Sequence, residues 1–170
     1  EQMAELVLDA GAMDVLVADT PAKIKDAWAA RSSFLEAIMH ETKLLDECDV
    51  VVPVNKIADY LDFVNKTGED CGLVIKSFGH AGDGNLHIYQ CSNDLEEEEF
   101  KSRVDKFFEI IYREATNCGG LVSGEHGIGS GKIKYLVDSV GETNMALMEG
   151  IKRVFDPKMI LNPGKVCYRL

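Results

Sequence analysis

Hydrophobic and polar residues recur along this chain with two different periods. A period near 3.6 predicts amphipathic helices, and short apolar or β-branched runs predict strands. The predicted helices cover residues 1–10, 22–41, 55–64, 94–117, 132–138 and 142–155. The predicted strands cover residues 14–18, 49–53, 73–78, 86–91 and 120–123. Thr20 and Pro21 are typical of a helix N-terminus, and Gly119 is typical of a helix stop.

The order of these elements predicts the fold class. Strands are interleaved with helices, and the runs at 73–78 and 86–91 are separated by a segment rich in Gly, Asp and Asn, which predicts a hairpin. We expect an α+β fold with a small, mainly antiparallel sheet and helices packed on one face, ferredoxin-like with enlarged helices. The strands are too few and the glycine loops wrongly placed for a doubly wound nucleotide-binding domain.

Composition narrows the class of protein. A chain of 170 residues, 46% hydrophobic and 28% charged, has the size and balance of one globular domain. Its net charge of −11 repels phosphate backbones, which argues against nucleic acid as a partner. No apolar run approaches the roughly 20 residues of a transmembrane segment. The five cysteines form no C-x-x-C pair, which argues against a disulfide framework and predicts the reducing cytoplasm.

Two glycine-rich segments carry three of the four histidines. His80 and His87 bracket the turn between the two predicted hairpin strands, and Glu125 and His126 lie within the glycine-rich segment 123–129. Two imidazoles and a carboxylate are a common ligand set for a catalytic divalent metal, because they leave coordination positions open. We therefore expect His80, His87 and Glu125 to bind a metal, which leaves His126 to transfer protons.

Other interpretations of these residues stay open at this point. The first segment also has the composition of a simple hairpin turn whose histidines only flank it. The second could be an anion-binding loop before a helix, although Ser130 stands where a Walker motif requires lysine. Arg31 falls on the apolar stripe of the helix 22–41, where a guanidinium either reaches the surface, forms a buried ion pair or clamps a carboxylate.

The two motifs, together with the Ile-Leu-Asn-Pro-Gly-Lys run at 160–165, resemble the C-terminal domain of the FAD-linked oxidases of the vanillyl-alcohol-oxidase-type superfamily. The nearest groups are D-lactate dehydrogenase, the glycolate oxidase flavin subunit and D-2-hydroxyglutarate dehydrogenase. The resemblance covers nearly the whole chain. It implies that residues 1–170 form a single C-terminal substrate- and metal-binding domain, a fragment that lacks the N-terminal FAD-binding domain of the family.

The resemblance also implies roles for individual residues. His80, His87 and Glu125 match the family's metal ligands, which hold zinc or manganese depending on the member. His126 matches the proposed general base, and Arg31 matches an arginine that holds the substrate carboxylate. Asn162 and Lys165 are expected to reach the FAD cofactor or the domain interface, although an Asn-Pro-Gly run near the end of a chain is as easily a turn.

Two positions depart from the pattern of the D-2-hydroxyglutarate dehydrogenases. Glu47 occupies the place of a lysine in those enzymes, and Tyr89 occupies the place of an asparagine. Both departures argue against a second substrate carboxylate. They favour a small monocarboxylate such as lactate or glycolate.

The resemblance therefore predicts a flavin-dependent dehydrogenase that oxidises a small D-2-hydroxy acid to the 2-oxo acid, passes electrons to a partner protein, and is inactive as this fragment. The main competing hypothesis is a self-contained metal-dependent hydrolase, because a His-His-Glu metal site with a neighbouring histidine equally activates water. A third hypothesis is a binding or assembly domain with a vestigial site. The hydrolase alone predicts turnover by this chain plus metal.

Overall fold

The computed structural model describes residues 2–167, and its contacts divide the chain into two compact units, Glu1–Glu41 and Thr42–Leu170. The N-terminal unit contains three helices among its described residues: α1 (Gln2–Asp9), α2 (Pro21–Ser32) and α3 (Phe34–Glu41). The Thr20 hydroxyl accepts a hydrogen bond from the amide of Lys23 at 3.3 Å, as expected of the predicted N-cap. Glu1, the first residue of the predicted opening helix, lies outside the described residues.

Two predictions for the N-terminal unit are wrong. The helix predicted over 22–41 is broken at Ser33, whose hydroxyl donates to the carbonyl of Ala29 at 3.0 Å; such a bond offers the backbone an alternative to regular helix. The strand predicted over 14–18 has no regular structure. Leu16 and Val17 are exposed there, and the described residues of this unit contain no strand with which they could pair.

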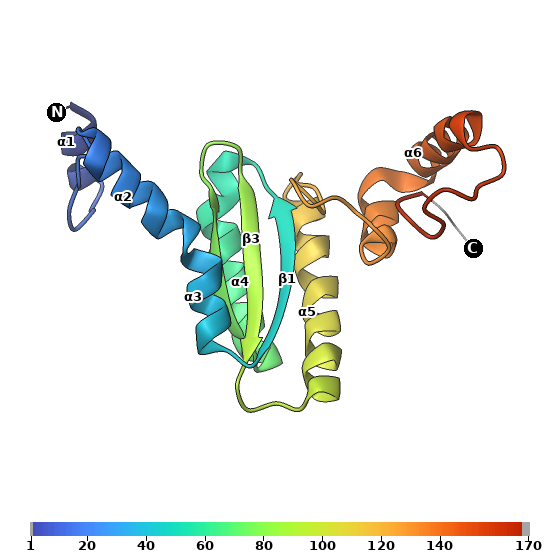
Figure 1. Ribbon diagram of the computed structural model, residues 1–170, viewed down its shortest axis with the longest axis horizontal. Helices are drawn as coiled ribbons and strands as arrows, with labels where there is room; N and C mark the ends of the chain where they lie inside the picture. Colours follow the sequence, from blue (N-terminus) through green and yellow to red (C-terminus); the bar gives the residue numbers. More distant parts are fainter. Residues whose placement is uncertain (1, 168–170) are drawn as a thin grey trace. The chain divides into compact units, whose positions relative to one another are not determined.

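The C-terminal unit contains the sheet (Figure 1). Its elements are β1 (Leu44–Val51), the 3-10 helix η1 (Val54–Lys56), α4 (Ile57–Cys71), β2 (Val74–His80), β3 (Asn85–Ser92), α5 (Glu97–Asn117) and α6 (Ile133–Phe155). The strands form an antiparallel sheet in the order β1-β3-β2. Leu121 adds one antiparallel bridge to Val51, at the position of a fourth strand beside β1. The order β1-α4-β2-β3-α5, with this bridge after α5, follows the ferredoxin-like arrangement, and the predicted α+β fold class with a small antiparallel sheet is confirmed.

The two faces of the sheet have different chemistry. Helices α4 and α5 pack on one face, as predicted, and Figure 1 shows them alongside the strands. The buried core between them includes Cys48, Val50, Tyr60, Val64, Leu86, Ile88, Val104, Phe107 and Ile111. Because side chains alternate along a strand, the opposite face carries the other set of residues, among them Glu47, Asp49, His80, Asn85, His87 and Tyr89. The polar face holds the candidate site.

The remaining helices differ from their predictions mainly in length. Helix α4 continues beyond residue 64 to Cys71 and ends at Gly72, whose φ of 66° is the left-handed stop. The two predicted C-terminal helices are confirmed, since Gly141 interrupts α6 with non-helical φ and ψ of 77° and 164°. Within residues 2–167, no helix combines the length and the apolar character that crossing a membrane requires.

Candidate functional site

The hairpin between β2 and β3 turns both of its histidines toward the same face of the sheet. His80 pairs with Asn85, and His87 lies two residues further along β3, so the two imidazoles share the polar face despite their odd separation in sequence. Gly84 has a φ of 81°, and a side chain at this position would collide with the carbonyl oxygen of Val52. The glycine is therefore needed for the turn to close this tightly.

A buried aspartate holds the second glycine-rich segment. Asp49 is 0% exposed and lies opposite His87 in the sheet. Its Oδ2 accepts hydrogen bonds from the backbone amides of Gly124, Glu125 and His126 at 2.8, 2.7 and 3.1 Å. The Ser123 hydroxyl donates to the same oxygen at 2.9 Å. These bonds hold residues 123–126 against the side chain of Asp49, and the predicted strand at 120–123 is reduced to a single bridge.

Lys132 supplies the counter-charge for this aspartate. Its side chain is 15% exposed, and its ammonium group pairs with Asp49 Oδ1 and also donates to the Asp49 carbonyl at 3.3 Å. Burial by itself raises the pKa of Asp49, but the hydrogen bond from Lys132 and those from the amides of Glu125 and His126 outweigh it and hold the pKa well below its ordinary value. The carboxylate is therefore ionised and serves as the fixed anchor of the loop.

The three predicted metal ligands converge. One ligand atom each from His80, His87 and Glu125 lies within 4.8 Å of the others. His80 Nε2 is 3.1 Å from Glu125 Oε1, and His87 Nε2 is 3.8 Å from Glu125 Oε2. Ligands at about 2.0–2.2 Å from a tetrahedral ion stand about 3.4 Å apart, so these separations suit a zinc-sized ion with little movement.

The exposure of these side chains leaves one side of the cluster open. The side chain of His87 is 7% exposed, whereas those of His80 and Glu125 are 39% and 46% exposed. A buried ligand on a strand fixes the position of an ion, and two more exposed ligands leave room beside it. The arrangement fits a site that keeps coordination positions for a small molecule.

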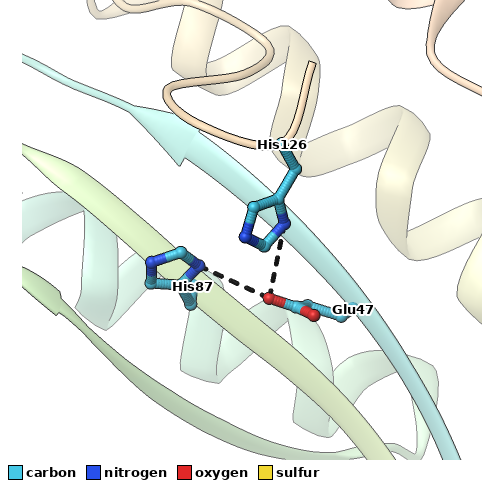
Figure 2. Close-up of side chains that lie close together, drawn as sticks. All are labelled: Glu47, His87 and His126. Atoms are coloured by element: carbon cyan, nitrogen blue, oxygen red, sulfur yellow. Dashed lines mark ion pairs between the residues drawn. The ribbon is translucent and has the colours of Figure 1, made fainter. Parts of the chain in front are cut away.

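His126 lies beside this cluster rather than in it. Its ring centroid is 4.9 Å from that of His87, and its side chain is 45% exposed. Its Nδ1 is 3.6 Å from Oε1 of Glu47 and 3.9 Å from Oδ1 of Asp49. Figure 2 shows Glu47, His87 and His126 pointing toward one another from β1, β3 and the glycine-rich loop. An imidazole in this place can exchange a proton with a molecule bound at the open side of the cluster.

The other predicted site residues lie elsewhere in the chain. Arg31 lies on α2 in the N-terminal unit, and its role as a carboxylate ligand stays a prediction. Asn162 has a φ of 45° in a turn, and Lys165 donates to the Ser130 hydroxyl at 3.3 Å. The amide of Val166 donates to the Gly129 carbonyl at 2.8 Å, so the C-terminal segment is tied to the end of the glycine-rich loop. A contact of Asn162 or Lys165 with a cofactor stays a prediction.

Two residues of the site, Asp49 and Lys132, were missed as functional groups from the sequence, and Glu47 was considered only for its bearing on the substrate. Asp49 anchors the loop, Lys132 neutralises it, and Glu47 faces two imidazoles. The signal for Asp49 was present, because a carboxylate inside an apolar strand needs a buried partner. Nothing in the spacing pointed to Lys132, which is 83 residues away.

Comparisons with known proteins agree on one family. The sequence model for "FAD linked oxidases, C-terminal domain" matches residues 1–166. The chain is 62% identical over 170 residues to a D-lactate dehydrogenase of Anaerostipes hadrus, covering 100% of this chain and 36% of that protein. It is 34% identical over 168 residues to the glycolate oxidase subunit GlcD of Bacillus subtilis (strain 168), covering 98% and 35%. It is 31% identical over 157 residues to a D-2-hydroxyglutarate dehydrogenase of Stutzerimonas stutzeri (strain A1501), covering 91% and 33%. The chain thus spans about a third of the length of these relatives.

Proposed function

Because the chain belongs to the family of FAD-linked oxidase C-terminal domains, we propose that it is the substrate- and metal-binding part of a flavin-dependent dehydrogenase. The substrate is a small D-2-hydroxy acid of the D-lactate or glycolate type, and the product is the 2-oxo acid. FAD is held mainly by a separate N-terminal FAD-binding domain, with Asn162 and Lys165 directed toward it. The longer protein acts in the cytoplasm and passes its electrons to a partner protein.

The observation that carries this proposal is the convergence of His80, His87 and Glu125 beside His126. The donor set contains two neutral-nitrogen ligands and one carboxylate, which suits zinc or manganese. The distances from the Glu125 carboxylate oxygens to Nε2 of His80 and Nε2 of His87, 3.1 and 3.8 Å, match the spacing of ligands around one ion. A divalent ion bound there would lower the pKa of the hydroxyl group of a chelated 2-hydroxy acid.

The chain's own residues account for binding and proton transfer. Arg31 binds the substrate carboxylate through its guanidinium group. His126 accepts the hydroxyl proton at Nε2, the ring nitrogen that does not face Glu47. The FAD of the separate domain would take the hydrogen on carbon 2 together with two electrons, as a hydride. Glu47 places a carboxylate beside the site, which disfavours a substrate with a second carboxylate and supports a monocarboxylic acid.

The test compares the 170-residue chain with the longer protein that carries the FAD-binding domain. We expect the longer protein to reduce a redox dye with D-lactate or glycolate, and to do so much more slowly with D-2-hydroxyglutarate. The chain alone, loaded with zinc or manganese, is expected to bind the ion and to show no turnover. Hydrolysis of ester or amide substrates by the loaded chain alone would favour the hydrolase hypothesis instead.

A matched pair of variants isolates the role of the general base. In the longer protein, His126→Gln is expected to lower kcat by about 100-fold or more with metal content unchanged. His40→Gln, at an exposed histidine of α3, is the control and is expected to behave as wild type. Equal loss of metal from His126→Gln and His80→Gln would show that the roles are misassigned.

A further inference from the structure

Glu47 lies between two imidazoles and is not one of the three predicted metal ligands. Its Oε1 is 3.4 Å from Nδ1 of His87 and 3.6 Å from Nδ1 of His126 (Figure 2). Glu47 Oε1 and His87 Nδ1 are both buried, and neither has a hydrogen-bond partner among the described residues. A small movement would let Nδ1–H of His87 donate a hydrogen bond to Glu47 Oε1, which would satisfy both buried atoms.

Asp49, the neighbouring carboxylate, is less suited to receive a proton from these rings. It already accepts hydrogen bonds from Ser123, three backbone amides and Lys132, and its nearest oxygen is 3.9 Å from His126 Nδ1. Glu47 instead directs an oxygen without a hydrogen bond at both rings. Among the described residues, Glu47 is therefore the carboxylate that can serve as acceptor for His87 and His126 together.

We infer that Glu47 is a positioning residue that fixes the tautomer of both His87 and His126. A neutral imidazole carries one N–H group, and a carboxylate at Nδ1 holds that hydrogen there. The lone pair then stays on Nε2 of each ring. Here the inference rests on the proposed function: Nε2 of His87 faces Glu125 and would bind the metal, and Nε2 of His126 would take the substrate proton.

One side chain would thereby prepare two neighbouring histidines for different tasks. A carboxylate behind a metal-binding imidazole orients the ring and makes it a better ligand. A carboxylate behind a general base orients the ring and stabilises the imidazolium that forms when the proton arrives. The competing assignment is a second cation site made by Glu47, His87 and His126, whose ligand atoms also lie within 4.8 Å of one another.

The direct test is nitrogen-15 NMR of the metal-free 170-residue chain at about pH 8.5, well above the ordinary imidazole pKa of about 6.5. We expect His87 and His126 to be protonated at Nδ1 in the wild type, and both rings to shift toward the Nε2 tautomer in Glu47→Gln. Asp46→Asn, an exposed neighbour on the same strand, is the control and leaves both tautomers unchanged. Protonation of either ring at Nε2 in the wild type overturns the inference without any variant.

Titration with Mn²⁺ provides an independent readout. The wild type is expected to bind one ion, and Glu47→Gln to bind it about 10- to 100-fold more weakly, as losses of carboxylates behind metal ligands do. A second equivalent of Mn²⁺ that disappears in Glu47→Gln overturns the inference in favour of a second cation site. If the wild type binds no Mn²⁺ or Zn²⁺, the proposed function is wrong, and the tautomers of the metal-free chain still decide whether Glu47 positions the rings.

Discussion

The most demanding prediction concerns Asp49→Asn, which keeps the shape of the side chain and removes its charge. The carboxylate accepts bonds from four donors of residues 123–126 and pairs with Lys132. An asparagine oxygen can replace the acceptor for the loop amides. Its NH₂ group would then face the ammonium of Lys132, and two donors cannot bond to each other.

The magnitude follows from the burial of the pair. Breaking a buried ion pair by removing one partner costs about 3–5 kcal/mol, and hydrogen bonds to a charged acceptor are stronger than neutral ones by about 1 kcal/mol each. These contributions share one network and are not additive, and Lys132 at 15% exposure can partly turn to water. We therefore expect Asp49→Asn to lower the free energy of unfolding of the C-terminal unit by about 3–5 kcal/mol.

Urea unfolding followed by far-UV circular dichroism measures this change. Asp46→Asn, at an exposed position on the same strand, is the control and is expected to stay within about 0.5 kcal/mol of wild type. Because folding lowers the pKa of Asp49, its stabilisation is full above the ordinary value of 3.8 and is lost as the pH falls below it. The gap between wild type and Asp49→Asn should therefore narrow in acid. A loss below 1 kcal/mol at neutral pH would refute the account of the loop anchor.

Three further predictions follow from single contacts. Gly84→Ala should lower the stability of the hairpin by about 2 kcal/mol or more in thermal unfolding, because the φ of 81° and the nearby Val52 carbonyl exclude a side chain. Gly82→Ala is the control and should be near neutral, because the space around Gly82 is open. His80→Ala should abolish binding of Zn²⁺ in calorimetry, while His126→Ala should retain it; the reverse order would show that the site is misassigned. Burial raises the pKa of Cys48 to about 12, so a thiol reagent at pH 8 should label this residue only after unfolding; rapid labelling of the native chain would contradict its burial.

Much of the fold could be predicted from local pattern. The hairpin at His80 and His87 has two β-rich runs around a glycine turn, and the helix stop at Gly119 depends only on nearby residues. Strand β1 begins at Leu44 rather than at the predicted residue 49, because Asp46 and Glu47 interrupt the apolar run in the sequence. From the sequence alone, Glu47 has the character of an exposed surface residue. Its neighbour in the site, His87, lies on another strand, so the local pattern does not reveal their contact.

What could not be predicted depends on individual hydrogen bonds and strand pairings that the apolar pattern does not encode. The helix breaks at Ser33, whose hydroxyl bonds to the Ala29 carbonyl, and the apolar stripe does not reveal whether this bond or a regular helix is formed. The apolar run at 14–18 resembles a strand, but a strand also needs a neighbour, and the described residues of the N-terminal unit offer none. The loop at 123–126 takes its shape from Asp49, about 75 residues earlier, and no periodicity encodes that distance.

The most direct test of the central claim is anomalous X-ray scattering at the zinc edge from crystals of the chain soaked with Zn²⁺. We expect one strong peak at about 2.0–2.2 Å from Nε2 of His80, Nε2 of His87 and a carboxylate oxygen of Glu125. We also expect no peak at this position in His87→Ala. Zinc bound at full occupancy elsewhere, with these three side chains uninvolved, would contradict it.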